Sequence, residues 1–352
     1  MRISVMDLQV GDRTGSDVFN WNGLLVVSAH TVLNADDIDK LQLHNIDYVD
    51  IMMRQAEHST EKQLQPALSE PTQTLAQTAA YEEAVSGIKD LFNQITAQGK
   101  IEEKQVEQCF APLANHFIEQ KDVVSLLLTL NNKDDYTYQH SVQVGMISYY
   151  IAKWLGQTEE EALYAGKAGY LHDLGKSRID NAILQKPGFL TKDEFEQVKK
   201  HAEYGHEMIL ASGLPEPIAL AALQHHERLD GTGYPARLRG QDIHPLARIV
   251  AVADVYSAMI SHRVYQEKQD LLHVLKELHR LSFGKLDPKI TQVFIRNMIP
   301  NFINKRILLT NGENGIIIMT HPTDFFRPLI QVGEQFINLS EHPQLEIQEI
   351  YM

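Results

Sequence analysis

Apolar residues recur at spacings of three and four along most of the chain between Tyr81 and Arg296. This spacing places them on one face of an α-helix, and a chain that buries several such faces packs as a helical domain. The pattern predicts helices over residues 123–130, 141–154, 159–171, 192–210, 218–226, 246–260 and 271–281. The central part of this 352-residue chain is therefore expected to be all-helical.

The two ends of the chain carry a different pattern. The first residues alternate apolar and polar side chains around turns at Gly11-Asp12 and Asn22-Gly23, which predicts a small α/β N-terminal module. After Pro300, short apolar runs around an Asn-Gly-Glu-Asn-Gly turn predict a small β-rich C-terminal appendage. The expected fold class is mainly α, divided into the N-terminal module at 1–57, a linker and connecting helices at 58–120, the helical domain at 121–303 and the appendage at 304–352.

Composition excludes several classes of protein. With 43% hydrophobic and 22% charged residues, the chain is expected to be globular rather than disordered. A net charge of −14 argues against nucleic-acid polymers as partners, because these require a basic surface. The apolar stretches fall short of the roughly 20 residues that span a bilayer, and the N-terminus lacks the apolar core of a signal peptide. We therefore expect no membrane span and a cytoplasmic location.

The content of histidine and cysteine limits the kind of metal site. The single cysteine, Cys109, excludes a cysteine-rich zinc site, whereas 16 histidines are available. A metal would therefore be held by imidazole and carboxylate groups. Bound metals can reverse the sign of the potential in one cleft, so the negative net charge still permits a phosphate-bearing small ligand.

Histidines and aspartates cluster where the predicted helices end. Adjacent residues on a helix point about 100° apart, so one metal does not readily take both members of an adjacent pair as ligands. Two metals remove this conflict if the carboxylate of Asp173 bridges them. We therefore predict that one metal is held by His140, His172 and Asp254 and the other by His201, His225 and His226.

Two metals at such a site have a chemical purpose. A water between two divalent ions loses a proton near neutral pH, and the same ions hold phosphate oxygens and offset charge on the leaving oxygen. Lys176 follows Asp173 by one turn, where its ammonium can bind a phosphate oxygen or steady the nucleophile; otherwise it is a solvated lysine near a helix end. The pattern is typical of a phosphodiester hydrolase, and we predict Asp173 and Lys176 as catalytic residues.

Two motifs give the chain a specific resemblance. HDLGK at 172–176 and HHERLDGTGYP at 225–235 resemble the signature of the HD-GYP family, a branch of the HD metal-dependent phosphohydrolases. The similarity runs from about Asp134 to Asp287. It implies a helical domain that binds two or three iron or manganese ions and hydrolyses cyclic di-GMP to linear pGpG and often onward to GMP. It also implies the metal-ligand role of the same seven residues, and identifies Lys176 as a phosphate-binding lysine.

The resemblance also implies contacts to the substrate. Arg263 and Tyr265 stand where the family is expected to contact the ligand, and Arg237 or Arg178 can supply another phosphate contact. Tyr234 either shapes the cleft or packs against a neighbouring helix. The predicted substrate-binding residues are thus Lys176, Tyr234, Arg237, Arg263 and Tyr265.

Some positions depart from the family pattern. Members with a third metal carry a glutamate four residues before the first histidine, where this chain has Tyr136, with Asp134 and Asp135 further upstream. We therefore expect two divalent metal ions per chain, iron or manganese, although other transition metals also suit such ligands. The segment at 177–188 and His262, which replaces a common aspartate, also differ and touch no predicted ligand. Whether hydrolysis stops at pGpG is left open.

Two functions from different classes remain. The first is an active phosphodiesterase on cyclic di-GMP, or a variant that acts on another cyclic dinucleotide or a nucleotide phosphate. The alternative is a weakly active or inactive cyclic di-GMP receptor or adaptor that signals through protein contacts, with a diguanylate cyclase as one candidate partner. The complete ligand set with Lys176 favours the first, and the absent glutamate favours the second.

The oligomeric state is also left open by the sequence. A helix at 81–98 can pair with its own copy in a homodimer or pack within one chain.

Overall fold

The structure of the protein is a computed structural model. It describes residues 71–117, 136–260, 271–321 and 324–351, together with shorter pieces of the N-terminal region at 2–5, 8, 11–15, 18–19, 25–27, 31–34, 37–38, 41, 46 and 48–52. The chain divides into two compact units, Met1–Leu68 and Ser69–Met352.

The first unit contains short antiparallel strand pairs. Strand β1 (Arg2–Ser4) pairs with β4 (Tyr48–Asp50), and β2 (Val18–Phe19) pairs with β3 (Leu25–Val27). A small apolar cluster fills this unit, formed by Val5, Leu8, Val18, Val27, Leu33, Leu41, Val49 and Ile51.

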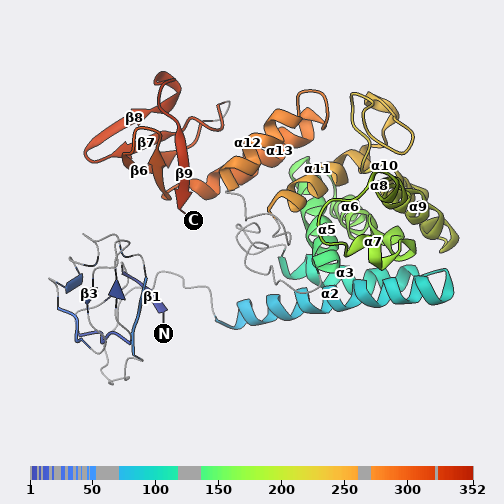
Figure 1. Cartoon of the computed structure of the whole chain (residues 1–352), viewed down its shortest axis with the longest axis horizontal. Helices are drawn as coiled ribbons and strands as arrows, with labels where there is room; N and C mark the ends of the chain where they lie inside the picture. The colour runs from blue at the N-terminus through green and yellow to red at the C-terminus, as the bar shows by residue number, and fades with distance from the viewer. Residues whose placement is uncertain are drawn as a thin grey trace. The chain divides into compact units, whose positions relative to one another are not determined.

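The second unit begins with long helices (Figure 1). Helix α2 spans Pro71–Gln98, α3 spans Glu103–Phe117, α5 spans Tyr136–Trp154 and α6 spans Glu159–Leu171. The start of α6 is fixed locally, because Thr158 accepts a hydrogen bond from the amide of Glu161 and the Glu161 carboxylate accepts one from the amide of Thr158. This cap sets where α6 begins and, 13 residues later, where His172 emerges at its end.

Shorter helices and turns complete the helical region. They are η2 (Leu174–Arg178), α7 (Asn181–Leu184), α8 (Lys192–Lys199), α9 (His201–Ala211), α10 (Glu216–Gln224), η3 (Gly240–Asp242), α11 (Pro245–Ile260), α12 (Leu271–Leu281), α13 (Pro288–Met298) and η4 (Ile299–Phe302). The single helix predicted over 192–210 is wrong: the amide of Lys200 bonds back to Gln197, and a new helix begins at His201. The helix predicted over 123–130 lies outside the described residues.

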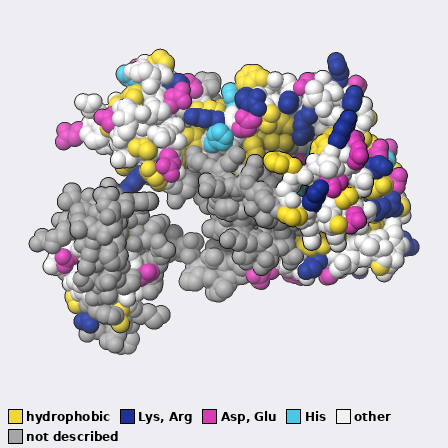
Figure 2. Space-filling model, viewed as in Figure 1, with side chains coloured by type: hydrophobic (Ala, Val, Ile, Leu, Met, Phe, Trp, Pro, Cys, Tyr) yellow, Lys and Arg dark blue, Asp and Glu magenta, His cyan; other side chains and the backbone are white. Residues whose placement is uncertain are grey.

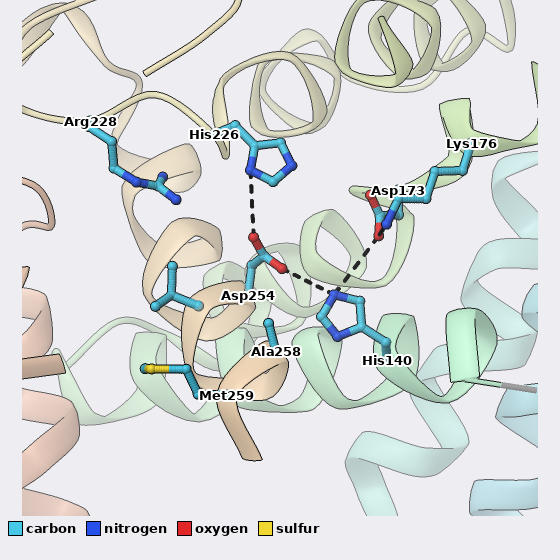
Figure 3. Close-up of a pocket in the computed structure, with 9 residues that line it drawn as sticks. His140, Asp173, Lys176, His226, Arg228, Asp254, Ala258 and Met259 are labelled. Carbon is cyan, nitrogen blue, oxygen red and sulfur yellow. Dashed lines mark hydrogen bonds and ion pairs between the residues drawn. The ribbon is translucent and has the colours of Figure 1, made fainter. Parts of the chain in front are cut away.

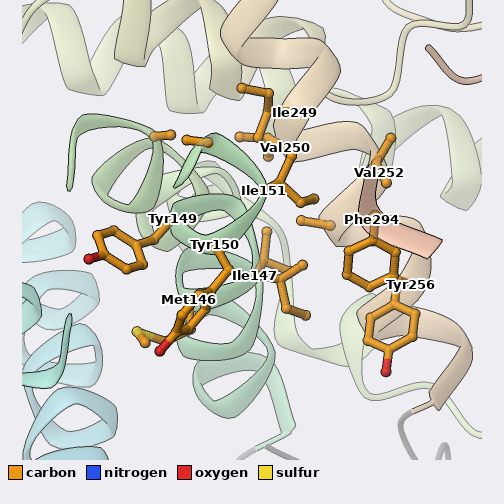
Figure 4. Close-up of a cluster of buried hydrophobic side chains, with 14 of the residues drawn as sticks. Met146, Ile147, Tyr149, Tyr150, Ile151, Ile249, Val250, Val252, Tyr256 and Phe294 are labelled. Atoms are coloured by element: carbon orange, nitrogen blue, oxygen red, sulfur yellow. The ribbon is translucent and has the colours of Figure 1, made fainter. Parts of the chain in front are cut away.

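Part of the core of this unit lies between α5, α11 and α13 (Figure 4). Apolar side chains from each helix are fully enclosed, and the rings of Tyr256 and Phe294 meet at a centroid distance of 4.7 Å. Burial of this kind contributes roughly 25 cal/mol for each Å² of apolar surface removed from water. The packing holds α5 and α11 side by side, and these two helices carry His140 and Asp254.

A five-stranded antiparallel sheet follows the helices. Its strands are β5 (Arg306–Leu309), β6 (Asn314–Met319), β7 (Leu329–Val332), β8 (Gln335–Asn338) and β9 (Ile347–Tyr351). They lie in the sheet in the order β8-β7-β6-β5-β9, and the short 3₁₀ helix η5 (Leu339–Glu341) connects β8 to β9. The turn between β5 and β6 falls at the predicted Asn-Gly-Glu-Asn-Gly segment. The predicted fold class, mainly α with small β-containing ends, is confirmed, while the four-part division of the chain stays a prediction.

None of the helices in the described part of the chain combines the length and the apolarity that crossing a membrane requires.

Candidate metal centre

The seven predicted metal ligands converge on one point from five segments of the second unit. His172 caps the end of α6, and Asp173 directly precedes η2. His201 opens α9, and His225 caps the end of α10 with His226 next to it. The remaining two, which lie within helices, are His140 on α5 and Asp254 on α11.

Asp173 lies at the middle of the cluster and is almost fully buried. Its Oδ2 atom is 3.2 Å from Nε2 of His172 and 3.9 Å from Nε2 of His140. Its Oδ1 atom faces the other way, 3.4 Å from Nε2 of His201 and 4.0 Å from Nε2 of His225. The two oxygens of this carboxylate therefore face two different sets of histidines.

Asp254 completes the half of the cluster that contains His140. Its Oδ1 atom lies 3.1 Å from Nε2 of His140 and 3.9 Å from Nε2 of His172, and its Oδ2 atom lies 3.8 Å from Nδ1 of His226. Donor atoms of His140, His172 and Asp254 lie within 4.8 Å of one another, and the same holds for His201, His225 and His226. These two groups agree with the division expected from the sequence, and a third group within the same distance, His172, Asp173 and His225, links them. Metal binding by these residues stays a prediction.

Backbone carbonyls orient three of the imidazole rings. Nδ1 of His172 donates to the carbonyl of Gly169 at 2.7 Å, Nδ1 of His201 to that of Val198 at 2.6 Å, and Nδ1 of His225 to that of Ala222 at 2.8 Å. A carbonyl only accepts, so the proton of the neutral ring stays on Nδ1 and the lone pair on Nε2 points into the cluster. His140 differs, because its Nδ1 lies 3.0 Å from the hydroxyl of Ser257.

The charge states of the cluster suit a divalent cation. Burial lowers the pKa of His225 well below its ordinary value, and burial lowers that of His226 to about 3. Burial alone would raise the pKa of Asp173, but the charges of His172 and Lys176 hold it well below its usual range. Carboxylates are thus ionised and most rings neutral at pH 7, which is the state that binds metals.

His172 is the exception among these rings. Burial lowers its pKa, but the adjacent carboxylate of Asp173 raises it by more, so the net pKa lies above the ordinary value of histidine. Metals bind the unprotonated ring, so a proton and a metal would compete for Nε2 of His172.

Two buried atoms show that the residues fit a metal. Among the described residues, Nε2 of His172 and Oδ1 of Asp173 make no hydrogen bond of good geometry, although Oδ2 of Asp173 lies 3.2 Å from the first and Nε2 of His201 lies 3.4 Å from the second. Buried polar atoms are nearly always hydrogen-bonded, so two such atoms on adjacent residues require an explanation. Nitrogen and oxygen donors in this arrangement suit iron, manganese, zinc or nickel.

A cavity of about 300 Å³ opens beside the cluster (Figure 3). In that view Lys176 and Arg228 lie on opposite sides of Asp254. Nζ of Lys176 bonds to Oδ2 of Asp173, and Nη1 of Arg228 donates to the carbonyls of His225 at 3.0 Å and Glu227 at 2.8 Å. The cavity is lined by His140, Asp173, Lys176, His226, Arg228 and Asp254 and by the apolar side chains of Val255, Ala258 and Met259.

Gly175, in the HDLGK motif, allows two segments of the site to meet. A Cβ atom at Gly175 would collide with the backbone carbonyl of His201 and with the amide of Gly205. Only a residue without a side chain permits this approach. The glycine therefore lets α9 bring His201 up to Asp173.

The loop after His226 folds back over the predicted metal ligands. The buried carboxylate of Glu227 accepts hydrogen bonds from the amides of Ala236 at 2.7 Å and Leu238 at 3.0 Å. A Cβ atom at Gly233 would lie 2.5 Å from the carbonyl of His226, so a side chain does not fit there. The ring of Tyr234 stacks on the ring of His226, with centroids 4.7 Å apart. Tyr234 thus packs on a predicted ligand.

The two hydrogen bonds accepted by Glu227 can be tested for their contribution to the stability of this loop. Replacing Glu227 with glutamine puts an amide NH₂ against a backbone N–H, which leaves buried donors without an acceptor. We expect Glu227→Gln to lower the free energy of unfolding by about 1–3 kcal/mol. Chemical denaturation measures this, with Glu207→Gln as the control: Glu207 is 62% exposed and pairs with Arg178, so a change below about 0.5 kcal/mol is expected. Equal changes in the free energy of unfolding for both variants would show that the two hydrogen bonds of Glu227 do not stabilise the loop.

Other predicted substrate contacts are not brought to the cavity. Arg237 is exposed, with a left-handed backbone φ of 57°, and it does not line the cavity. Arg178 bonds to Glu207 at 2.9 Å and covers the ring of Tyr204. The remaining positions that bear on substrate contacts or a third metal lie outside the described residues or have no described side chain: Asp134, Asp135, Tyr136, His262, Arg263 and Tyr265.

The sequence did not single out several residues that the structure places at the site. Arg228 and Glu227 stand inside the HHERLDGTGYP motif, so their positions were visible but the direction of their side chains was not. The pair Gln143 and Ser257 carried no signal, because the two residues are 114 positions apart and meet only in the folded chain.

Comparison with known proteins agrees with this geometry. The family model described as "HD domain" matches residues 125–290. The chain is 34% identical over 207 residues to a cyclic di-GMP phosphodiesterase from Pseudomonas aeruginosa, covering 58% of this chain and 50% of that protein. It is 35% identical over 195 residues to a 3'3'-cGAMP-specific phosphodiesterase from Vibrio cholerae, covering 51% of this chain and 44% of that protein. The chain thus spans about half the length of these curated relatives.

A solved structure shares the fold. The protein described as a HDG"Y"P protein from Bdellovibrio bacteriovorus superposes with a TM-score of 0.51 at 16% identity, covering 86% of this chain and 99% of that one. At this identity the likeness concerns the fold alone. The matched domain, the two motifs and the relatives lead to one conclusion: residues 125–290 match the HD domain family, and the motifs at 172–176 and 225–235 resemble those of its HD-GYP branch.

Proposed function

We propose that this protein is a metal-dependent phosphodiesterase that hydrolyses cyclic di-GMP to linear pGpG. The observation that carries the proposal is the placement of Asp173, whose two oxygens face two separate groups of histidines beside one cavity. The names of the relatives, which act on cyclic di-GMP or 3'3'-cGAMP, support a cyclic dinucleotide as the substrate.

We propose that these donor atoms form two metal positions, both filled in the active protein. One is formed by His140, His172 and Asp254, the other by His201, His225 and His226, and Asp173 is common to both. Two bound divalent ions would supply an activated water and would neutralise charge on the phosphate and on the leaving oxygen. Iron or manganese is the proposed metal.

Two cations of the chain itself are placed to bind the substrate. Lys176 and Arg228 line the cavity from different segments, so a phosphodiester group between them meets a positive charge on each side. Nη1 of Arg228 is bonded to two backbone carbonyls, which holds the guanidinium in place before substrate arrives. These two residues are the proposed phosphate contacts.

Part of the cavity lining is apolar. Val255, Ala258 and Met259 follow Asp254 along α11, and Met259 is half-buried at the cavity. A thioether packs well against the face of an aromatic ring. We propose that this apolar lining supports one guanine base of the substrate while its phosphate lies between Lys176 and Arg228.

The surface of the second unit does not exclude an anionic ligand. The net charge is −14, yet Lys and Arg side chains are mixed with Asp and Glu over the face of the helical region shown in Figure 2. Local cations rather than the overall charge therefore decide whether a dinucleotide approaches the cavity.

The reaction is a hydrolysis with a simple balance. The oxygen of water forms a bond to phosphorus, the bond from phosphorus to the 3′ oxygen breaks, and that oxygen takes up a proton. The product is linear pGpG with a 5′ phosphate. A second hydrolysis of pGpG would give GMP.

Turnover in ¹⁸O-labelled water tests the proposal. Protein purified without oxygen is mixed with cyclic di-GMP or, separately, 3'3'-cGAMP, and the products are separated and weighed by mass spectrometry. We expect pGpG that carries one ¹⁸O in its 5′ phosphate, with cyclic di-GMP consumed faster. Bound cyclic di-GMP without any product, with iron or manganese supplied, would contradict the proposal and would favour the receptor function.

A further inference from the structure

We propose that Gln143 and Ser257 are positioning residues for His140, which they hold in the protonation form that binds a metal through Nε2. The inference rests on the proposed metal-dependent function and assigns a role to two residues that line no cavity. Both side chains are fully buried. The proposal is that this pair determines the metal affinity of one half of the centre.

A chain of hydrogen bonds connects the pair to the site. Nδ1 of His140 lies 3.0 Å from the hydroxyl of Ser257, and that hydroxyl donates to Oε1 of Gln143 at 2.9 Å. Gln143 follows His140 by three residues on α5, and Ser257 follows Asp254 by three residues on α11. The bond between them therefore joins the two helices that carry His140 and Asp254.

The direction of these bonds determines where the proton of His140 resides. A hydroxyl has a single proton, and Ser257 gives it to Gln143, so the Ser257 oxygen must accept from Nδ1–H of His140. Nε2 then keeps its lone pair. The competing acceptor is Oδ1 of Asp254, 3.1 Å from Nε2, which would hold the proton there and prevent coordination through that atom.

His140 differs in this respect from three other ligands. His172, His201 and His225 bond through Nδ1 to backbone carbonyls, which accept whatever side chains surround them. For His140 the acceptor is a side chain, and its direction depends on a second side chain. Loss of either should therefore affect the half of the centre formed by His140, His172 and Asp254 and leave the other half unchanged.

Helix α2 encloses the far end of this hydrogen-bond chain. Burial raises the pKa of the Tyr81 hydroxyl on α2, and the adjacent Gln143 side chain offsets a smaller part of that shift. Phe92 of α2 meets the ring of Tyr138, two residues before His140, at 5.3 Å. The pair is thus held in a packed environment, with both side chains fully buried.

Titration of metal-stripped full-length protein with Mn²⁺ tests the proposal. We expect two Mn²⁺ ions to bind the unaltered chain. In Ser257→Ala and Gln143→Met, one of the two should bind about 10–100-fold more weakly while the other keeps its affinity, because partners of ligand side chains typically contribute that much. Ser257→Thr, which keeps the hydroxyl, should restore tight binding of both.

A matched control separates positioning from packing. Ser148 lies on α5, is equally buried and has no hydrogen-bond partner among the described residues, so Ser148→Ala should bind both ions as the unaltered chain does. Thermal melting of the metal-free proteins shows whether a variant is merely unstable. Two tight Mn²⁺ sites in Ser257→Ala, or equal weakening of both sites, would overturn the positioning role. Absence of Mn²⁺ binding by the unaltered chain would overturn the metal-dependent function itself.

Discussion

Replacing Asp173 with asparagine is expected to remove metal binding and phosphodiesterase turnover together. The carboxylate directs one oxygen to each group of histidines, and an amide has one oxygen and no charge. Losing even one group that stabilises a transition state lowers turnover by about 10²–10³-fold, so turnover should fall at least that far. Elemental analysis of the purified variant and chromatography of cyclic di-GMP after incubation measure the two losses.

The control for this variant is another aspartate of the same region. Asp180 caps α7 by accepting from the amide of Ala182 at 2.9 Å, and asparagine caps helices equally well. Asp180→Asn should therefore keep full metal content and turnover. An Asp173→Asn protein that retained both metals and most of its turnover would show that Asp173 is not the shared ligand.

Replacing Lys176 with glutamine is expected to separate catalysis from metal binding. The side chain of Lys176 is 25% exposed and lines the cavity, where a phosphate can reach it, and its ammonium bonds to Oδ2 of Asp173 without belonging to the donor set. Metal content should stay unchanged, while kcat falls by about 10²–10³-fold through loss of one charge that stabilises the transition state. Steady-state kinetics and elemental analysis on the same preparation check both parts.

Lys167 provides the matched control for this experiment. It lies on α6, is 13% exposed and pairs with Glu107 at 3.2 Å, and it does not line the cavity. Lys167→Gln should leave kcat and metal content unchanged. If Lys176→Gln instead lost its metals, the lysine would act by holding Asp173 in place and not by binding the substrate.

Much of the fold could be predicted because its signals are local. The apolar spacing gave α6 and α12 with their observed bounds, and the Asn-Gly-Glu-Asn-Gly turn indicated the pairing of β5 with β6. The break at Lys200 could not be seen, because the apolar spacing continues through it. The pairing of β9 with β5 is a long-range contact, which sequence spacing does not specify.

The residues of the candidate site could be predicted from the sequence where they stand in recognisable motifs. Adjacent pairs such as His172-Asp173 indicated two groups of ligands, and the structure brings these groups together around Asp173. The direction of Arg237, expected at the substrate, depends on a loop whose backbone turns it outward. Arg228 takes that place at the cavity because its backbone bonds fix it there.

The most direct test of the central claim is one paired measurement on protein purified without oxygen. Metal content is determined by elemental analysis, and conversion of cyclic di-GMP is followed by chromatography on the same sample. We expect about two metal ions per chain and the appearance of pGpG, with any GMP formed later. Full metal content and bound cyclic di-GMP without turnover, or turnover that persists after the metals are removed, would contradict the central claim.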